Sequence, residues 1–330
     1  MSRVDVFVPC YNYGRFLRPC VESVLTQDDV DVRVLILDDC SSDDSEKVGR
    51  QLAAEDPRVE YRRHAANRGH IATYNEGIDW ASGEYTLLLS ADDALTPDSL
   101  RRAAQLMDTH PHVSFVHGQS IRTSEPSREE FPPAGDCETS VISGQAFFRS
   151  ACESVQNVVE TPTAVVRTTT HKLVGGYRTE LPHAGDMELW LRLSLHGDVG
   201  YVHGVQAFYR VHGNNMSVGY QQMRDLRQRQ EVFRILFEEY PTRITDSDHW
   251  QKVATAALAW NAFWSATQAF DVGNSEVIDE YLEFAVKTDP RIRSSAAWWK
   301  LRMKRTMGST FWRLIRRPVR GIRRATALAK

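Results

Sequence analysis

Strand-like runs alternate with helical segments through the first 110 residues of this chain. Four such runs cover residues 4–8, 32–37, 59–62 and 85–89, and each is followed by a segment with apolar residues at helical spacing. Residues 85–89 are nearly all apolar, which is typical of a strand covered on both faces. The alternation predicts βαβ units and an α/β fold with a mainly parallel sheet flanked by helices.

Pairs of acidic residues follow two of these predicted strands. Asp38 and Asp39 come directly after the second strand, and Asp92 and Asp93 follow the fourth. In open α/β sheets, ligands bind in the crevice beyond the carboxyl ends of the strands. A carboxylate pair at that place can hold a hard cation. The pattern therefore predicts a ligand site at this edge of the sheet.

A solvated acidic turn is the alternative for Asp92 and Asp93, since short acidic turns are common. The residues that follow, 96–98, predict a helix that begins with Pro97 at its first helical position. Asp98 would then serve as an additional cap. From these residues alone, both interpretations stay open.

The rest of the chain divides into a mixed segment and a helical one. Strands are expected at residues 113–117 and 199–211, and the polar segment 119–139 predicts a surface excursion. A helix is expected to begin at Asp186, which places this acid at or near the helix N-terminus. Beyond residue 221 the pattern is continuously helical.

Cysteine spacing and hydropathy bear on the class of protein. The five cysteines show no paired C-x-x-C spacing, which argues against a disulfide framework and against a zinc site. No signal peptide is recognisable at the start. The most apolar segment, 253–270, is interrupted by polar residues, so we expect a helix buried in protein rather than a membrane span. These features predict a cytoplasmic, non-transmembrane protein.

Charge is distributed unevenly along the chain. The net charge is -3, but residues 290–330 hold 13 Lys or Arg and no Asp or Glu. The preceding 289 residues therefore hold the other 27 basic residues and all 43 acidic residues, a formal -16. An acidic body with a basic tail is predicted.

Four motifs in a fixed order carry a family resemblance. They are V-P-C-Y-N at residues 8–12, L-D-D-C-S-S-D at 37–43, S-A-D-D-A-L-T-P at 90–97 and G-D-M-E-L-W-L-R-L at 185–193. With these motifs the sequence resembles the family 2 glycosyltransferases of the GT-A fold, over about residues 4–217. The resemblance implies a catalytic domain at residues 1–218, with a helical C-terminal region and basic tail at 219–330.

A nucleotide-sugar pocket is implied by the same resemblance. A carboxylate that accepts from a base N–H, with an aromatic ring for stacking, would suit a base such as uracil, so a UDP-sugar donor is expected. A hexosyl or N-acetylhexosaminyl group would be transferred. The residues implied in donor binding are Pro9, Tyr11, Asn12, Asp38, Asp39, Asn67, Gly69, Asn75 and Asp92.

A divalent cation, Mn²⁺ or Mg²⁺, is also implied. The metal-binding acids of the family fall on Asp92 and Asp93, while Ser90 stands where the family often has a further acid. The cation would stabilise the charge that develops on the diphosphate leaving group. His212, in a Y-R-V-H segment similar to one near the end of such domains, could approach the metal or the diphosphate.

Asp186 corresponds to the catalytic base of the family, which implies inversion at the anomeric carbon. Gly185 replaces the acid that usually precedes this base. A plain helix N-cap is the alternative for Asp186, and Glu188 is the alternative base. Trp190 could be either a core residue or a platform for a sugar.

Two other functions stay open at this point. One is a non-catalytic GT-A-like module that binds a partner through its tail, and the other is a sugar nucleotidyltransferase, although no Gly-rich phosphate loop follows the first strand. The basic segment 311–324 favours an intramolecular or acidic protein contact, with peripheral binding at the inner face of a membrane as the alternative. The acceptor could be a glycan, a lipid-linked or carrier-bound group, or a small molecule. No nucleic acid partner is expected, and oligomerisation is left open.

Overall fold

The computed structural model describes residues 1–125, 135–213, 215 and 223–308. The chain forms two compact units. Unit 1 comprises residues 1–151, 156–221 and 231–245, and unit 2 comprises residues 152–155, 222–230 and 246–330. The predicted domain boundary after residue 218 lies outside the described residues and stays a prediction.

The elements alternate along the first part of the chain as predicted. The strands are β1 (Arg3–Cys10), β2 (Asp31–Asp38), β3 (Val59–Arg63), β4 (Tyr85–Leu88), β5 (Ala94–Leu95), β6 (Val113–Thr123), β7 (Thr139–Ile142), β8 (Val165–Arg167) and β9 (Asp198–Arg210). The helices are α1 (Gly14–Leu25), α2 (Ser45–Glu55), α3 (His70–Trp80), α4 (Ser99–Thr109), α5 (Gly144–Ser154), α6 (Thr168–Val174), α7 (Gly185–Ser194), α8 (Met223–Glu239), α9 (Ser247–Val272), α10 (Ile278–Thr288) and α11 (Ala296–Met307), with short 3-10 helices η2 (Thr161–Thr163) and η4 (Pro290–Ser294).

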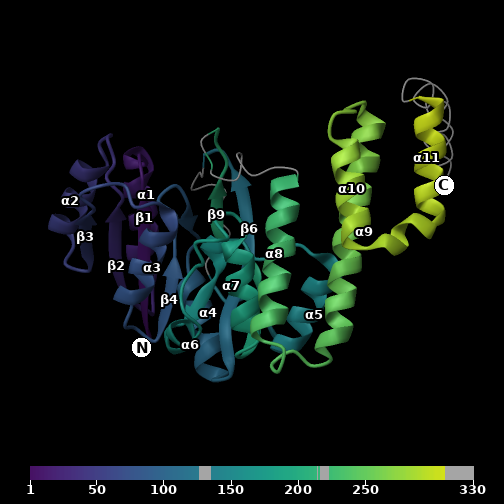
Figure 1. Ribbon diagram of the computed structural model, residues 1–330. Helices are drawn as coiled ribbons and strands as arrows, with labels where there is room; N and C mark the ends of the chain where they lie inside the picture. Colours follow the sequence, from purple (N-terminus) through teal and green to yellow (C-terminus); the bar gives the residue numbers. More distant parts are fainter. Residues whose placement is uncertain (126–134, 214, 216–222, 309–330) are drawn as a thin grey trace, which may run out of the picture. The chain divides into compact units, whose positions relative to one another are not determined.

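One mixed sheet organises unit 1 (Figure 1). Its strand order is β3-β2-β1-β4-β8-β6-β9-β5, and β7 pairs with β9. The first four strands run parallel, since β1 pairs in parallel with β2 and β4, and β2 with β3. Strand β8 is antiparallel to both β4 and β6. This confirms the predicted mainly parallel α/β fold.

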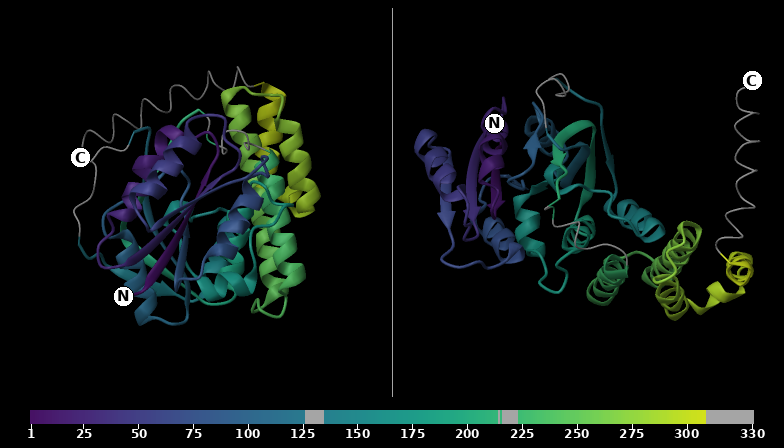
Figure 2. Two further views of the ribbon diagram at one scale, coloured as in Figure 1. Left: turned by 90° about the vertical axis from the view of Figure 1, so that its left-hand side faces the viewer. Right: turned by 90° about the horizontal axis from the view of Figure 1, so that it is seen from above.

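Both faces of the sheet are covered, as the apolar strands predict (Figure 2). Along β1, Val6 and Val8 belong to the same buried cluster as Leu17 and Val21 of α1. Phe7 points to the opposite face, where its ring lies under Gly77 of α3. Because alternate residues of a strand face opposite sides, one short strand supports helices on both sides of the sheet.

Two boundaries differ from the sequence prediction. Pro97 is not the first residue of a helix. It follows the short strand β5, and α4 begins two residues later at Ser99. Asp98 is the N-cap residue and has a left-handed conformation, with φ at 62°. The segment 119–123, predicted to be part of a surface excursion, continues strand β6, which pairs with β9 up to Thr123.

Helical packing builds unit 2, as the sequence predicted for the last third of the chain. Figures 1 and 2 show α9 and α10 side by side. Phe263 and Phe270 of α9 pack with Phe284 of α10 and Leu301 of α11 in one buried cluster. In the part of the chain that the structure describes, no helix is both long and apolar enough to cross a membrane. The basic segment 311–324 lies outside the described residues.

Candidate functional site

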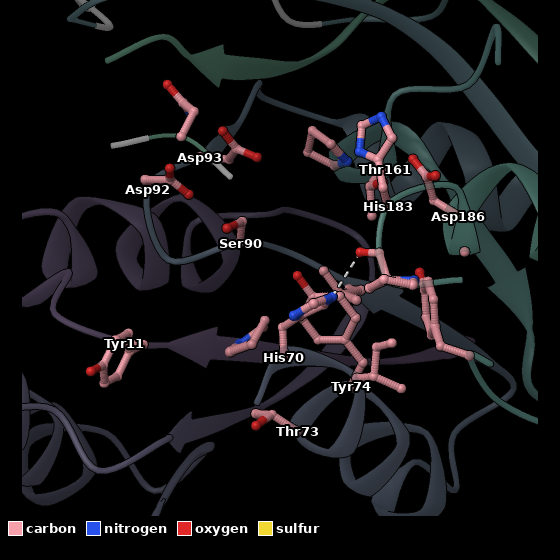
Figure 3. Close-up of a pocket in the computed structure, with 18 of the residues that line it drawn as sticks. Tyr11, His70, Thr73, Tyr74, Ser90, Asp92, Asp93, Thr161, His183 and Asp186 are labelled. Carbon is pink, nitrogen blue, oxygen red and sulfur yellow. Dashed lines mark hydrogen bonds between the residues drawn. The ribbon is translucent and has the colours of Figure 1, made fainter. Parts of the chain in front are cut away.

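A cavity of about 670 Å³ opens in unit 1 where the parallel strands end (Figure 3). Residues that follow β1, β2 and β4 line it, together with residues of α3, α7 and the loop before η2. Most residues predicted for the donor, metal and base line this one cavity: Pro9, Tyr11, Asp39, Asn67, Gly69, Asp92, Asp93 and Asp186.

The two acids after β4 lie on one side of the cavity, and Asp186 lies on the other (Figure 3). Ser90 lies next to Asp92 and Asp93 in the same view, and His183 lies beside Asp186. The strand end and the helix start therefore present carboxylates to a shared space. This is the arrangement that the sequence motifs predicted.

Asp92 and Asp93 are both buried and are held by the end of β9. The backbone N–H of Arg210 donates to Asp93 Oδ1 over 2.9 Å, and Arg210 Nε donates to the carbonyl of Asp92 over 2.8 Å. His212 Nε2 lies 2.9 Å from Asp92 Oδ2. Burial, reinforced by the neighbouring charge of Asp92, raises the pKa of Asp93 well above its usual range. A bound cation would offset the repulsion between these neighbouring carboxylates.

The chemistry of this pair fits a divalent cation. The second oxygen of Asp92, Oδ1, is buried and has no hydrogen-bond partner among the described residues. No group of three His, Cys, Asp or Glu side chains is arranged to hold a metal within the described chain. A cation bound at Asp92 and Asp93 would therefore need further ligands from solvent or substrate, as is usual for Mg²⁺ at phosphates. His212 contacts Asp92 but does not line the cavity, and its predicted approach to the metal or the diphosphate stays a prediction.

Asp186 is oriented by two hydrogen bonds at the N-terminus of α7. Its Oδ1 accepts from the backbone N–H of Met187 over 2.7 Å, and its Oδ2 accepts from Asn157 Nδ2 over 2.9 Å. Burial raises the pKa of Asp186, while the Met187 N–H, His183 and Asn157 partly oppose that rise. A carboxylate with a raised pKa that faces a cavity is suited to accept a proton.

The alternative base, Glu188, is committed to ion pairs. It is fully buried, and its oxygens lie 2.9 Å from Arg192 Nη2 and 3.1 Å from Arg178 Nε. It does not line the cavity. Trp190 is buried as well, with its ring centroid 5.6 Å from that of Phe115. This packing supports the core interpretation of Trp190.

The two acids after β2 have different surroundings. Asp38 is fully buried and accepts hydrogen bonds from the Tyr61 hydroxyl over 2.6 Å and from the Ser41 N–H over 2.8 Å. It does not line the cavity, whereas Asp39 does. Asp39 accepts from the backbone N–H of Arg68 over 2.7 Å and of Gly69 over 2.9 Å. Its carboxylate therefore shapes the loop that carries Gly69 into the cavity.

Asn12 and Asn75 connect neighbouring segments and do not line the cavity. Asn12 Oδ1 accepts from the backbone N–H of Ser42 over 2.8 Å, which joins the loops after β1 and β2. Asn75 of α3 donates to the carbonyl of Tyr177 over 3.0 Å and accepts from its N–H over 2.7 Å. Both amides hold loops that border the site, and their predicted contact with nucleotide stays a prediction.

Several cavity residues were not anticipated from the motifs. Tyr74 of α3 and Tyr177 pack edge to face with ring centroids 5.2 Å apart, and His70 Nε2 donates to the carbonyl of Pro182 over 3.0 Å. Arg122 and Glu160 form an ion pair of 2.7 Å at the cavity wall. Arg122 belongs to the part of β6 that was predicted to be a surface excursion. No spacing in the sequence links these residues to the acids.

The sequence of this chain is similar to those of known glycosyltransferases. Residues 5–159 match the family model described as glycosyl transferase family 2. An uncharacterized glycosyltransferase of Nostoc sp. is 30% identical over 170 residues, which cover 46% of this chain and 53% of the relative. The chain thus spans about half the length of this relative, and 21% of the chondroitin synthase of Pasteurella multocida.

Solved structures share the fold at low sequence identity. The TarS structure from S. aureus in complex with UDP-GlcNAc has a TM-score of 0.64 at 19% identity and covers 86% of this chain and 79% of its own. The mannosyltransferase PcManGT from Pyrobaculum calidifontis, in complex with GDP-Man and Mn²⁺, has a TM-score of 0.58 at 15% identity and covers 95% and 83%. These matches support the GT-A architecture.

Proposed function

This chain belongs to glycosyl transferase family 2, and on that premise we propose that it is a metal-dependent, inverting glycosyltransferase. The donor would be a nucleotide sugar, with UDP the expected nucleotide and a hexosyl or N-acetylhexosaminyl group transferred. One observation supports this proposal above all others. Asp92 and Asp93 line the same cavity as Asp186, from separate elements of the fold.

The placement of the acids suits displacement at a sugar carbon. Inversion requires that the attacking oxygen and the leaving diphosphate lie on opposite faces of the anomeric carbon. Asp186 would accept the proton of the acceptor hydroxyl as its oxygen bonds to that carbon. The bond from the carbon to the diphosphate oxygen breaks at the same time, and the nucleoside diphosphate leaves. Asn157 and the Met187 N–H hold the base in position for this transfer.

Asp92 and Asp93 would hold Mn²⁺ or Mg²⁺ near the diphosphate. The cation would supply Lewis acid stabilisation of the negative charge on the leaving group. The unpartnered Oδ1 of Asp92 supports this role, because a buried carboxylate oxygen without a hydrogen bond is costly unless something binds it. Of the two solved structures with a similar fold, one is a complex with UDP-GlcNAc and the other a complex with GDP-Man and Mn²⁺, which supports a nucleotide-sugar donor of either kind.

A ligand panel tests the donor. The melting temperature of the full chain is measured with UDP, GDP, dTDP and their sugars, with and without Mn²⁺. We expect one nucleotide to raise the melting temperature, and Mn²⁺ to increase the effect. A panel in which no nucleotide or nucleotide sugar shifts the melting temperature would contradict the proposal.

Two variants test the roles of the acids. Asp93→Ala should abolish the metal-dependent hydrolysis of the donor that is expected without acceptor. Asp186→Asn should retain nucleotide binding but lose transfer by about 100- to 10,000-fold, as removal of a general base does. Asp79→Asn, an exposed acid of α3, is the matched control and should behave as wild type. Full activity of either site variant would refute the role of that residue.

A further inference from the structure

Helix α11 of unit 2 presents a ridge of large apolar side chains to solvent. Trp299, Met303 and Met307 follow one another at intervals of four residues, so they lie along one face of the helix. Their exposed fractions are 55%, 63% and 42%. A contiguous exposed apolar surface of this kind marks a site of interaction more often than isolated exposed residues do.

Contacts on the other face of α11 fix its orientation. Leu301 and Lys304 are buried, and Lys304 Nζ lies 3.8 Å from Asp271 of α9. Arg305 forms an ion pair of 2.7 Å with Asp279 of α10. The hydroxyl of Ser295 caps the helix by accepting from the Trp298 N–H. These contacts keep the ridge turned outward.

Basic residues flank the ridge. By helical spacing, Lys300 lies on one side of it and Arg302 on the other. Both are exposed, and neither forms an ion pair within the described part of the chain. The guanidinium of Arg302 lies 5.4 Å from the ring centroid of Trp299. The ridge is thus an apolar strip with a cationic border.

We propose that this face of α11 docks on an anionic lipid surface. Tryptophan is favoured at the level of lipid headgroups, and apolar side chains with basic neighbours are the two signals that hold a helix on a membrane. Lys300 and Arg302 would contact lipid phosphates while Trp299 and Met303 enter the boundary with the acyl chains. Peripheral binding does not depend on the proposed catalytic function.

The positive charge on and near α11 favours a lipid surface over a second copy of this chain or an acidic protein. Lys300 and Arg302 border this face without an ion pair in the described part of the chain, so two copies of the face would repel each other. In sequence, residues 290–330 contain 13 basic residues and no acidic ones, and such a positive excess suits an anionic lipid surface better than a bounded acidic patch on one protein. The lipid surface also accounts for the exposed Trp299 and Met303, which charge pairing alone would leave in water.

Vesicle flotation of the full chain tests the proposal. Vesicles of phosphatidylcholine alone are compared with vesicles that also contain phosphatidylglycerol. We expect binding to the anionic vesicles, little binding to the neutral ones and weaker binding at high salt. A chain that does not float with anionic vesicles would overturn the proposal, and an acidic protein would then be the better candidate.

Matched variants locate the contact. Met303→Glu should weaken binding about tenfold or more, since it removes an inserted side chain and adds a repelled charge. Leu173→Glu makes the same kind of change at a residue of α6 that is 73% exposed, and it should have no effect. Lys300→Glu should weaken binding at least about fivefold, whereas Lys47→Glu, at an exposed lysine of α2, should not.

Fluorescence gives an independent readout of the ridge. Phosphatidylcholine with brominated acyl chains, mixed into the anionic vesicles, should quench part of the tryptophan emission when the chain binds. Trp299→Phe should remove most of that quenching while leaving flotation largely intact. Binding that is equal in wild type and in all α11 variants would show that the contact lies elsewhere, and it would refute the proposal.

Discussion

The hydrogen bond that Asn157 donates to Asp186 affects the protonation of the proposed base. This bond stabilises the charged form of a carboxylate whose pKa is already raised by burial. If Asp186 is the base, activity is lost as the pH falls through that raised pKa. Asn157→Ala should raise the pKa further and move the acidic limb of the kcat/KM profile toward neutral pH, with a rate about fivefold lower at acidic pH.

The control for this prediction lies next to Asn157 in the chain. Val158 is 62% exposed and lines the same cavity. Val158→Ala disturbs the same loop without removing a hydrogen bond from Asp186, so its pH profile should keep the wild-type shape. An unchanged acidic limb in Asn157→Ala would mean that the titrating group is not Asp186.

Individual residues also show where sequence motifs are informative. The motifs located Asp39, Asp92, Asp93 and Asp186 because a strand end or helix start fixes which loop each acid occupies. They could not distinguish Asp38 from Asp39, since only the direction of each side chain decides which faces the cavity. Tyr74 and Tyr177 meet across 102 intervening positions, and no local pattern predicts such a pair.

Helix α3 packs on the sheet at Gly77 and also contributes residues to the cavity. A Cβ at this position would lie 2.2 Å from the ring of Phe7, which is fully buried in β1 and has no room to move. Gly77→Ala should therefore destabilise the chain by about 1–3 kcal/mol, even though alanine favours helices by roughly 1 kcal/mol over glycine. Urea unfolding at neutral pH measures this change.

A second consequence of Gly77→Ala concerns the cavity. Thr73 and Tyr74 of the same helix line it, so a displaced α3 should also weaken nucleotide binding. Asp79→Ala, an exposed substitution in the last turn, provides the control and should be close to neutral in both assays. A Gly77→Ala chain as stable as wild type would show that α3 can shift without cost.

The sequence predicted helices and strands well where their own residue pattern specifies them. It predicted strands poorly where they form only by pairing with a distant strand. The parallel strands and their helices follow from apolar runs and helical spacing. Strand β5 has two residues, and β6 continues through the polar segment 119–123 because β9 pairs with it. Strands of this kind form because they pair with a strand distant in sequence, so their own residues do little to predict them.

One buried carboxylate, that of Asp5, joins three segments of unit 1. Asp5 of β1 is fully buried and accepts from Arg33 of β2 over 2.7 Å and 3.1 Å. It also accepts from the backbone N–H groups of Ser82 over 2.6 Å and of Gly83 over 2.8 Å, just before β4. The central parallel strands are thus connected at their amino-terminal ends.

The charge of Asp5 should make stability depend on pH. Burial alone would raise the pKa of Asp5, but the hydrogen bonds from Arg33, Ser82 and Gly83 outweigh it, and the pKa is lowered. A lowered pKa in the folded state contributes stability that is present above the unfolded-state value of about 3.9 and is lost as the pH falls through the folded-state value. Acid should therefore weaken unit 1 partly through this residue.

Asp5→Asn tests this connection. The variant should lose about 2–4 kcal/mol of unfolding free energy at neutral pH, because two backbone donors and Arg33 lose a charged acceptor. The difference from wild type should shrink as the pH falls below the folded-state pKa, where wild-type Asp5 is also neutral. Urea unfolding at several pH values, followed by tryptophan fluorescence, measures both effects. Asp31→Asn, an exposed acid on β2, should leave the stability unchanged at every pH, and a constant deficit for Asp5→Asn across the pH range would mean that shape rather than charge holds this junction.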